Sequence, residues 1–178
     1  MAIEYITSTS NDVSGFFVPL ADLYKIVYAE PPYREGPEQV ARFREALPGE
    51  AERLGFTLIA AAERGSLVGA AYGWTMPSGT WWQRADGEPP GELRDVEKFA
   101  VMEWIVHPRR QRHGIGAELL RRLLADRKEQ YATLASDPRS QARKIYARNG
   151  WRQVGKSTLP WGPPMDLLVL PLHHDAIA

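Results

Sequence analysis

Two glycines stand at a predicted turn whose chemistry suits a phosphate group. The turn, residues 111–116 with the sequence QRHGIG, follows an apolar run over residues 99–106 and Pro108. Apolar residues then recur at helical spacing, which places the glycines at the N-terminus of a helix. Such an end carries about half a positive charge and several unpaired N–H donors. Because glycine has no Cβ, an anion can approach the backbone closely, and the sequence predicts a phosphate site here.

The spacing Gln111-x-x-Gly114-x-Gly116 resembles the acyl-CoA pyrophosphate loop of the GNAT acetyltransferase superfamily. The turn has neither the Lys-Ser/Thr pair of a P-loop nor the third glycine of a dinucleotide-binding fingerprint. The resemblance implies acetyl-CoA as cosubstrate, and the alternative is an ordinary glycine-containing turn between a strand and a helix. The cofactor-binding residues that it implies in the turn are Gln111, Arg112, His113, Gly114, Ile115, Gly116 and Ala117.

Glu103 is the only ionisable residue in the apolar run FAVMEWIV, which is predicted to be a strand buried on both faces. A buried carboxylate is costly unless it is hydrogen-bonded, paired or functional, and burial raises its pKa. Acetyl transfer from a thioester needs a neutral amine, so a carboxyl with a raised pKa suits a base that acts directly or through water. We predict Glu103 as the base or amine-orienting group. The alternative is a structural carboxylate that an Arg or Tyr satisfies, and the family often has its base at a neighbouring position, here Met102. Glu97 and Asp95, at the edge of the preceding loop, are the other candidates for the base.

A second landmark is Ala142-x-x-x-Tyr146-x-x-x-Gly150-Trp151, which is similar to the family's helix that carries a catalytic tyrosine. The resemblance implies that Tyr146 is the general acid for the leaving thiolate. A phenol with a pKa of about 10 is a weak acid toward a thiol with a pKa of about 8.5. Tyr146 could therefore act mainly as a hydrogen-bond donor, unless a cation such as Arg143 lowers its pKa. The alternative is an ordinary core tyrosine.

Further parts of the cofactor site follow from the resemblance alone. The main chain of Trp104, Ile105 and Val106 corresponds to the strand segment that pairs with pantetheine, unless these groups bond a neighbouring strand instead. Arg139 stands where the family often has an asparagine, and we assign it to the cofactor site. At least one of three arginines is expected to contact the phosphates, the alternative being simple solvation: Arg109, Arg110 and Arg112.

Aromatic residues gather in two regions where the family usually builds its acceptor site. These regions are the connection between the first two predicted helices and a long loop over residues 77–96. Their rings could form a wall for a cationic or planar amine, with core and loop packing as the alternative for each residue. The predicted substrate-binding residues are Tyr28, Tyr33, Trp74, Trp81 and Trp82.

The composition limits the classes of function. The chain has 178 residues and is most simply one domain over residues 1–178, as a monomer or homodimer. With 22 basic and 22 acidic residues it has no net charge, so neither a nucleic acid nor a membrane is expected as a partner. The lack of cysteine excludes disulfides and an acyl-cysteine intermediate. We expect a soluble, cytoplasmic protein without a metal, in which His173-His174 form a solvated tail.

The elements that must position these residues follow from periodicity and turn signals. The expected strands cover residues 3–7, 56–62, 67–76, 99–106, 132–136, 151–156 and 166–170. The expected helices cover residues 16–28, from 37 to the proline at 48, 116 to about 130, and from Asp137 as N-cap to Gly150 as C-cap. Residues 99–136 form a parallel, right-handed strand–helix–strand unit, and the last two strands should be antiparallel.

This order of elements is also that of the GNAT fold. We therefore predict an α/β (α+β) protein with a single GNAT domain, whose mixed, mostly antiparallel sheet of about six to seven strands is flanked by helices. The resemblance implies direct transfer of an acetyl group from acetyl-CoA to a primary amine of a small molecule or peptide. One alternative is a non-catalytic acyl-CoA sensor or protein-interaction module, and another is a toxin that acetylates charged tRNA, against which the zero net charge counts.

Overall fold

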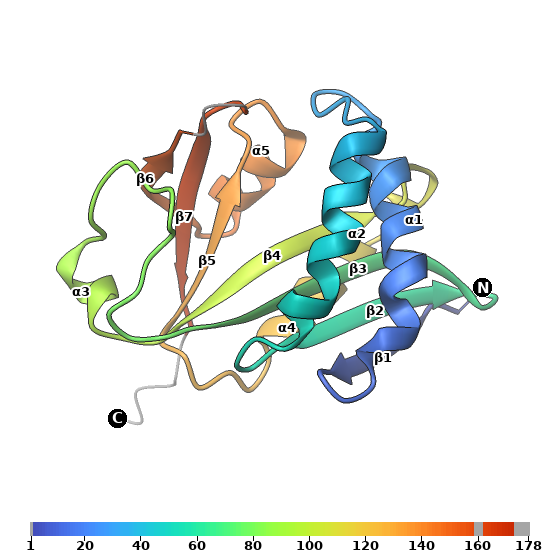
Figure 1. Ribbon diagram of the computed structural model, residues 1–178, viewed down its shortest axis with the longest axis horizontal. Helices are drawn as coiled ribbons and strands as arrows, with labels where there is room; N and C mark the ends of the chain where they lie inside the picture. The colour runs from blue at the N-terminus through green and yellow to red at the C-terminus, as the bar shows by residue number, and fades with distance from the viewer. Residues whose placement is uncertain (1, 159–161, 173–178) are drawn as a thin grey trace. The chain divides into compact units, whose positions relative to one another are not determined.

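The computed structural model describes residues 2–158 and 162–172, and in this part of the chain seven strands form a mixed sheet. The strands pair in the order β1-β2-β3-β4-β5-β7-β6, which confirms the predicted fold (Figure 1). Their bounds are β1 (Glu4–Thr9), β2 (Thr57–Glu63), β3 (Ser66–Met76), β4 (Lys98–Val106), β5 (Tyr131–Ser136), β6 (Arg152–Ser157) and β7 (Met165–Pro171).

Five α-helices and two short 3-10 helices connect these strands in the described residues. The helices are η1 (Val13–Phe16), α1 (Phe17–Tyr28), α2 (Pro37–Ala51), α3 (Gly91–Arg94), η2 (Pro108–Arg110), α4 (Ile115–Leu124) and α5 (Gln141–Arg148). None of them has the length and apolarity needed to span a membrane. The predicted His173-His174 tail lies outside the described residues.

The chain divides into two compact units, which we call unit 1 and unit 2. Unit 1 contains Met1–Trp74 and Met102–Ala125, and unit 2 contains Thr75–Val101 and Asp126–Ala178. Strand β4 contributes residues to both units. The expectation of one domain over the whole chain stays a prediction.

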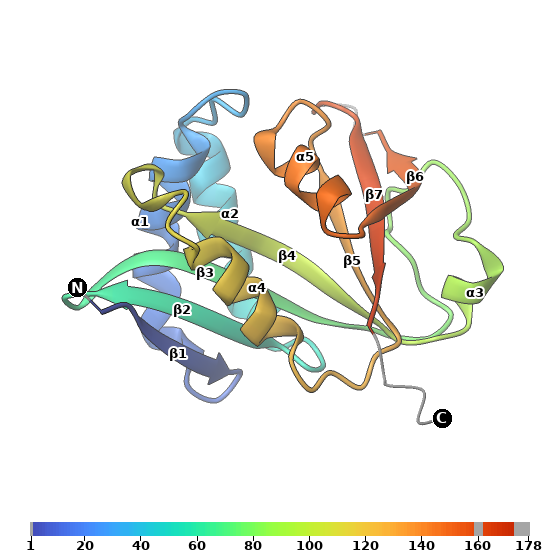
Figure 2. The same cartoon turned by 180° about the vertical axis from the view of Figure 1, so that it is seen from behind.

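Unit 1 is a sheet covered by helices on both faces. Strands β1, β2 and β3 are antiparallel neighbours, and the predicted hairpin turns at Arg64 and Gly65, which both have positive φ. Helices α1 and α2 lie on one face (Figure 1) and α4 lies on the other (Figure 2). The core between α1, α2 and the sheet includes Leu20, Leu47 and Leu58. Within this unit Ile105 of β4 is buried, whereas Met102, Glu103, Trp104 and Val106 are partly buried, so the predicted burial of the strand on both faces is only partly met here.

Gly69 allows α4 to pack closely on β3. A Cβ at this position would lie 3.0 Å from Leu119 Cδ1 and 3.1 Å from Ile115 Cγ2, closer than ordinary van der Waals contact. Ile115 and Leu119 are buried residues of α4, one turn apart. The missing side chain therefore fixes the start of α4, and with it the glycine turn, against the sheet.

Unit 2 contains the parallel pair and the C-terminal strands. Lys98–Ala100 of β4 pair in parallel with residues 131–133 of β5, and β6 and β7 are antiparallel, both as predicted. Strand β7 is also antiparallel to β5, a pairing that the sequence did not predict. The long segment 77–96 includes the short helix α3, which the sequence did not predict. The buried Lys98 anchors this segment, because its Nζ donates to Leu93 O at 2.6 Å and to Val96 O at 2.8 Å.

Two predicted helix ends are wrong. Helix α2 continues through Pro48 to Ala51, because Leu47 and Ala51 are buried in the core and offset the hydrogen bond that the proline cannot donate. Helix α4 ends at Leu124 instead of about residue 130. Asp126 has a φ of 55°, which no right-handed helix accepts.

The predicted start of α5 is also wrong. Ser140 is the N-cap, since its Oγ accepts a hydrogen bond from Arg143 N at 3.2 Å. Asp137 instead accepts from the main-chain N of Arg139 at 2.8 Å, within the turn before the helix. The C-terminal end is as predicted, with Gly150 at a φ of 86° directly after the cap residue Asn149.

Candidate active site

The glycine turn leaves several main-chain donors at the start of α4. Gly114 has a φ of 79°, a conformation that favours glycine, and a Cβ there would have no atom within 4 Å. The first helical hydrogen bond runs from Glu118 N to Gly114 O at 3.1 Å. The N–H groups of the first helical turn consequently have no acceptor within α4, namely those of Ile115, Gly116 and Ala117. This geometry can bind an anion.

Side chains from the turn and from β4 hold this geometry. Gln111 Nε2 donates to Val106 O at 3.2 Å, so this predicted cofactor residue ties the turn to the end of β4. His113 Nδ1 lies 2.8 Å from Gln111 O. Trp104 Nε1 donates to Gly116 O at 2.8 Å, which ties β4 to the first turn of α4. Ile105 is buried against the α1 and α2 face.

The three arginines of the turn differ in their surroundings. Arg110 pairs with Glu63, with Nε 3.0 Å from Oε2, so its charge is already compensated. Arg109 and Arg112 are exposed, and Arg112 has a positive φ. The exposed pair is therefore the better source of positive charge for a phosphate.

Glu103 lies on β4 with its carboxyl directed toward α1. Tyr28 Oη donates to Glu103 Oε2 at 2.6 Å. The pKa of Glu103 is raised to about 8. Burial is the largest cause, the hydrogen bond from Tyr28 acts in the opposite direction, and the charges of Glu50 and Glu35 add to the rise. The structure thus joins the predicted base to a residue that the sequence assigned to the acceptor site.

Two similar pairs adjoin this one in unit 1. Tyr24 Oη donates to Glu35, and Tyr72 Oη donates to Glu50 Oε2 at 2.8 Å. Burial raises the pKa values of Glu35 and Glu50 as well. We call the six residues the tyrosine–glutamate cluster: Tyr24, Tyr28, Tyr72, Glu35, Glu50 and Glu103. The sequence analysis missed four of them, because nothing local marks residues that meet only in the folded chain.

The predicted acceptor aromatics fall in both units. In unit 1, the rings of Tyr28 and Tyr33 meet edge to face with centroids 4.8 Å apart, and Trp74 packs against the core with Arg53 5.6 Å from its ring. In unit 2, Trp81 is partly buried, and Trp82 Nε1 donates to Thr133 Oγ1 at 3.0 Å. Trp82 thus anchors the long segment on β5.

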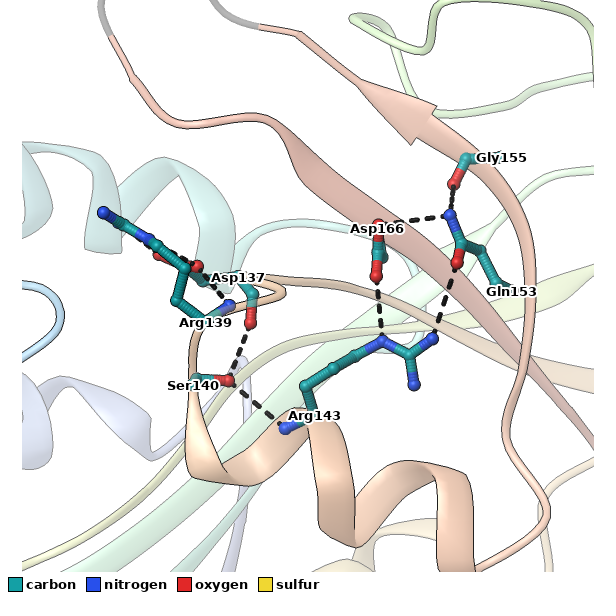
Figure 3. A network of polar contacts seen from close by, with 7 residues as sticks. All are labelled: Asp137, Arg139, Ser140, Arg143, Gln153, Gly155 and Asp166. Carbon is teal, nitrogen blue, oxygen red and sulfur yellow. Dashed lines mark hydrogen bonds and ion pairs between the residues drawn. The ribbon is translucent and has the colours of Figure 1, made fainter.

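Tyr146 is buried on α5, in unit 2, and its ring meets Trp151 edge to face at 5.7 Å. Arg143, three residues earlier, pairs with Asp166 on β7 (Figure 3). Its Nε donates to Asp166 Oδ2 at 2.9 Å, and Gln153 Nε2 donates to Asp166 Oδ1 at 3.1 Å. The Arg143 guanidinium is therefore compensated by a carboxylate on β7, and it clamps α5 to that strand.

Arg139 is also paired with a carboxylate. Its Nε lies 3.0 Å from Asp137 Oδ1 and its Nη2 lies 2.7 Å from Oδ2 (Figure 3). Hydrogen bonds from Arg139 hold the pKa of the buried Asp137 below its usual range. Asp137 thus fixes the turn between β5 and α5 through its bonds to Arg139. The assignment of Arg139 to the cofactor site stays a prediction.

Comparison with known proteins identifies the family of the chain. Residues 20–151 match the model of the Acetyltransferase (GNAT) family, which covers most of the chain, so the protein belongs to that family. A GCN5-like protein acetyltransferase, Rv2170 of Mycobacterium tuberculosis, is 28% identical over 153 residues, covering 77% of this chain and 74% of the relative.

Solved structures share the fold at lower identity. PH1933 from Pyrococcus horikoshii has a TM-score of 0.68 and 20% identity, and the match covers 97% of this chain and 99% of that one. The PaiA N-acetyltransferase from Thermoplasma acidophilum, solved in complex with coenzyme A, has a TM-score of 0.62 and 14% identity, covering 96% of this chain and 99% of that one.

Proposed function

We propose that the protein is an acetyl-CoA-dependent N-acetyltransferase that transfers an acetyl group directly to a primary amine of a small molecule or peptide. The observation that carries the proposal is Glu103, a partly buried carboxyl with a pKa raised to about 8 on the strand that leads into the glycine turn. Three comparisons support it: the chain belongs to an acetyltransferase family, the Mycobacterium relative is described as a protein acetyltransferase, and the Thermoplasma structure contains coenzyme A.

The residues of the glycine turn fit a pyrophosphate. Gly114 leaves open space where a side chain would stand, and the three unpaired N–H groups of α4 can donate to phosphate oxygens. Bound acetyl-CoA supplies an activated acetyl group as a thioester. We assign the phosphates to the turn with Arg112 and His113 beside it, the pantetheine arm to the main chain of residues 104–106, and a further contact to Arg139.

Glu103 accepts the proton of the attacking amine. For an amine with a pKa of about 10.4, a carboxyl at about 8 leaves an uphill transfer of about 3 kcal/mol, whereas the ordinary value of 4.5 leaves about 8 kcal/mol. Burial thus makes the ionised carboxyl a stronger base, and its ionised fraction grows as the pH approaches and passes 8. In the transfer the N–C bond forms, the C–S bond breaks, and the amine proton moves to Glu103.

Tyr146 stabilises the leaving sulfur in this proposal. Its hydroxyl donates a hydrogen bond to the thiolate or transfers its proton, and the phenol then regains a proton from solvent. On the acceptor side, the three carboxyls of the tyrosine–glutamate cluster favour an amine that arrives as a cation.

Thiol release from acetyl-CoA with a panel of amines tests the activity. We expect turnover with at least one cationic amine, and loss of turnover in Glu103→Gln and Tyr146→Phe. Coenzyme A binding without turnover on any amine would contradict the proposal and favour a non-catalytic sensor.

Calorimetry with coenzyme A tests the turn separately. In Gly116→Ala the protein itself accepts the new methyl, since a Cβ would lie 3.5 Å from Trp104 Nε1, so we expect normal folding with affinity at least about tenfold weaker. Gly155→Ala is the matched control, because a Cβ there lies 3.7 Å from Leu167 Cδ1 and far along the chain from the turn. Unchanged affinity in Gly116→Ala would overturn the placement of the pyrophosphate.

A further inference from the structure

We propose that Tyr28 is a positioning residue for Glu103, which orients the carboxyl and sets its protonation, rather than a contact for the acceptor. This inference rests on the proposed function, because it gives Tyr28 a role only through the base. It changes the assignment from the aromatic pattern, which placed Tyr28 among the substrate-binding residues.

The first support is the geometry of the carboxyl. The bond of 2.6 Å links α1 to β4 across 75 residues of sequence and engages Oε2. Among the residues that the structure describes, Oε1 has no hydrogen-bond partner. One oxygen is thus held in place while the other remains available for the proton of an amine or of a bridging water.

The second support is that the Tyr28 phenol stays protonated and so can donate to the Glu103 carboxylate whenever that group is ionised. Burial and the charge of Glu103 raise the pKa of Tyr28 well above 10, so the phenol keeps its proton at every pH at which the protein functions. The ring is fixed as well, with Tyr24 at 4.4 Å and Tyr33 at 4.8 Å between centroids. The position of the ring and the protonation state of the phenol are therefore fixed.

The third support is the charge environment of Glu103. The charges of Glu50 on α2 and of Glu35 before α2 both raise its pKa. The hydroxyls of Tyr24 on α1 and Tyr72 on β3 are occupied by Glu35 and Glu50. The hydrogen bond from Tyr28 lowers the pKa of Glu103, whereas burial and the two neighbouring charges raise it. Removal of the hydroxyl should therefore raise this pKa further.

The experiment compares pH profiles of kcat/KM for the acceptor, with the concentration of neutral amine held constant. In Tyr28→Phe we expect the midpoint of the acidic limb to move up by about one pH unit, activity at pH 7 to fall about tenfold, and the KM for acetyl-CoA to stay the same. Tyr72→Phe is the matched control: it removes the same kind of hydroxyl from Glu50, and its midpoint should move by less than half as much.

A ¹³C NMR titration of the glutamate carboxyls reads the same quantity without turnover. The signal that is lost in Glu103→Gln identifies the residue, and in Tyr28→Phe its midpoint should lie above that of the unchanged protein. An unchanged midpoint would overturn the role of Tyr28 even if Glu103→Gln is inactive, which leaves the proposed function intact. Full activity of Glu103→Gln would instead overturn Glu103 as the base, and this inference with it.

Discussion

Unit 1 partly buries three carboxyl groups and unit 2 buries two, and the two units satisfy them with different partners. In unit 1, Glu35, Glu50 and Glu103 accept hydrogen bonds from neutral tyrosine hydroxyls, and burial raises their pKa values. In unit 2, Asp137 and Asp166 pair with arginine guanidinium groups. The pKa of Asp137 is lowered accordingly.

The difference shows how the partner decides what a buried carboxyl can do. A hydroxyl donor satisfies the oxygen but brings no positive charge, so the carboxyl can take up and release a proton near neutral pH. A guanidinium keeps the carboxylate charged, so the pair can only hold structure. Unit 1 is therefore suited to proton transfer, and the network of unit 2 to fixing the helix that carries Tyr146.

The largest expected effect is on catalysis. Glu103→Gln removes the proton acceptor but keeps the shape and an oxygen for Tyr28, so kcat/KM for the acceptor should fall by about 10²–10⁴-fold. Calorimetry should show unchanged affinity for coenzyme A. If kcat/KM falls by less than about tenfold, Glu103 is not the proton acceptor, and the tyrosine-bonded carboxyls of unit 1 would not differ in function from the arginine-paired carboxyls of unit 2.

The second effect concerns the network of unit 2. Arg143→Met leaves Asp166 without its cation, and because both side chains of this pair are largely buried, the free energy of unfolding should fall by about 2–3 kcal/mol. Urea denaturation measures the change. In the control Arg152→Met, which breaks the exposed pair with Glu92, the loss should stay below about 0.5 kcal/mol.

The third effect is a gain of stability in Glu103→Gln. The folded pKa of about 8 lies above the ordinary 4.5, so the folded state holds this proton more tightly, and stability is lost as pH rises through that window. Glutamine mimics the protonated form, so the variant should be more stable than the unchanged protein by about 1–3 kcal/mol at pH 8. Thermal unfolding at pH 5 and pH 8 should show the gain at the higher pH only. The pH dependence that Asp137 contributes has the opposite sign. Because its pKa is lowered in the folded state, its contribution to stability is lost as pH falls.

The smallest effect is the pH dependence of the unchanged enzyme. With a base of pKa about 8, kcat/KM at constant neutral amine should rise about fivefold between pH 7 and pH 8 and level off above pH 9. A profile that is flat from pH 6 upward would mean that the base behaves like an ordinary exposed carboxyl.

The sequence carried most of the fold because its signals are local. The apolar run of β4, the Arg64-Gly65 hairpin and the glycine after α5 lie at the predicted places. The helix ends at Pro48 and Asp137 were wrong because tertiary packing and a side chain two residues away overrode the local preference.

The site was only partly predictable. Glu103 stood out because it interrupts an apolar run, and its raised pKa follows from burial alone. Its partners could not be predicted, since the three tyrosine–glutamate bonds join residues 11, 22 and 75 positions apart and depend on how α1 and α2 pack on the sheet. The placement of the phosphate turn and of Tyr146 in catalysis stays a prediction.

The buried Lys98 offers a practical reporter. The other four lysines of the chain are exposed, namely Lys25, Lys128, Lys144 and Lys156. Because the amine of Lys98 is enclosed by carbonyl groups, reagents that acylate lysine should spare it until residues 77–97 open. Mass spectrometry after brief chemical labelling would thus report when that segment opens. Acylation of the exposed lysines alone would indicate an intact fold, whereas acylation of Lys98 would indicate that the segment had opened.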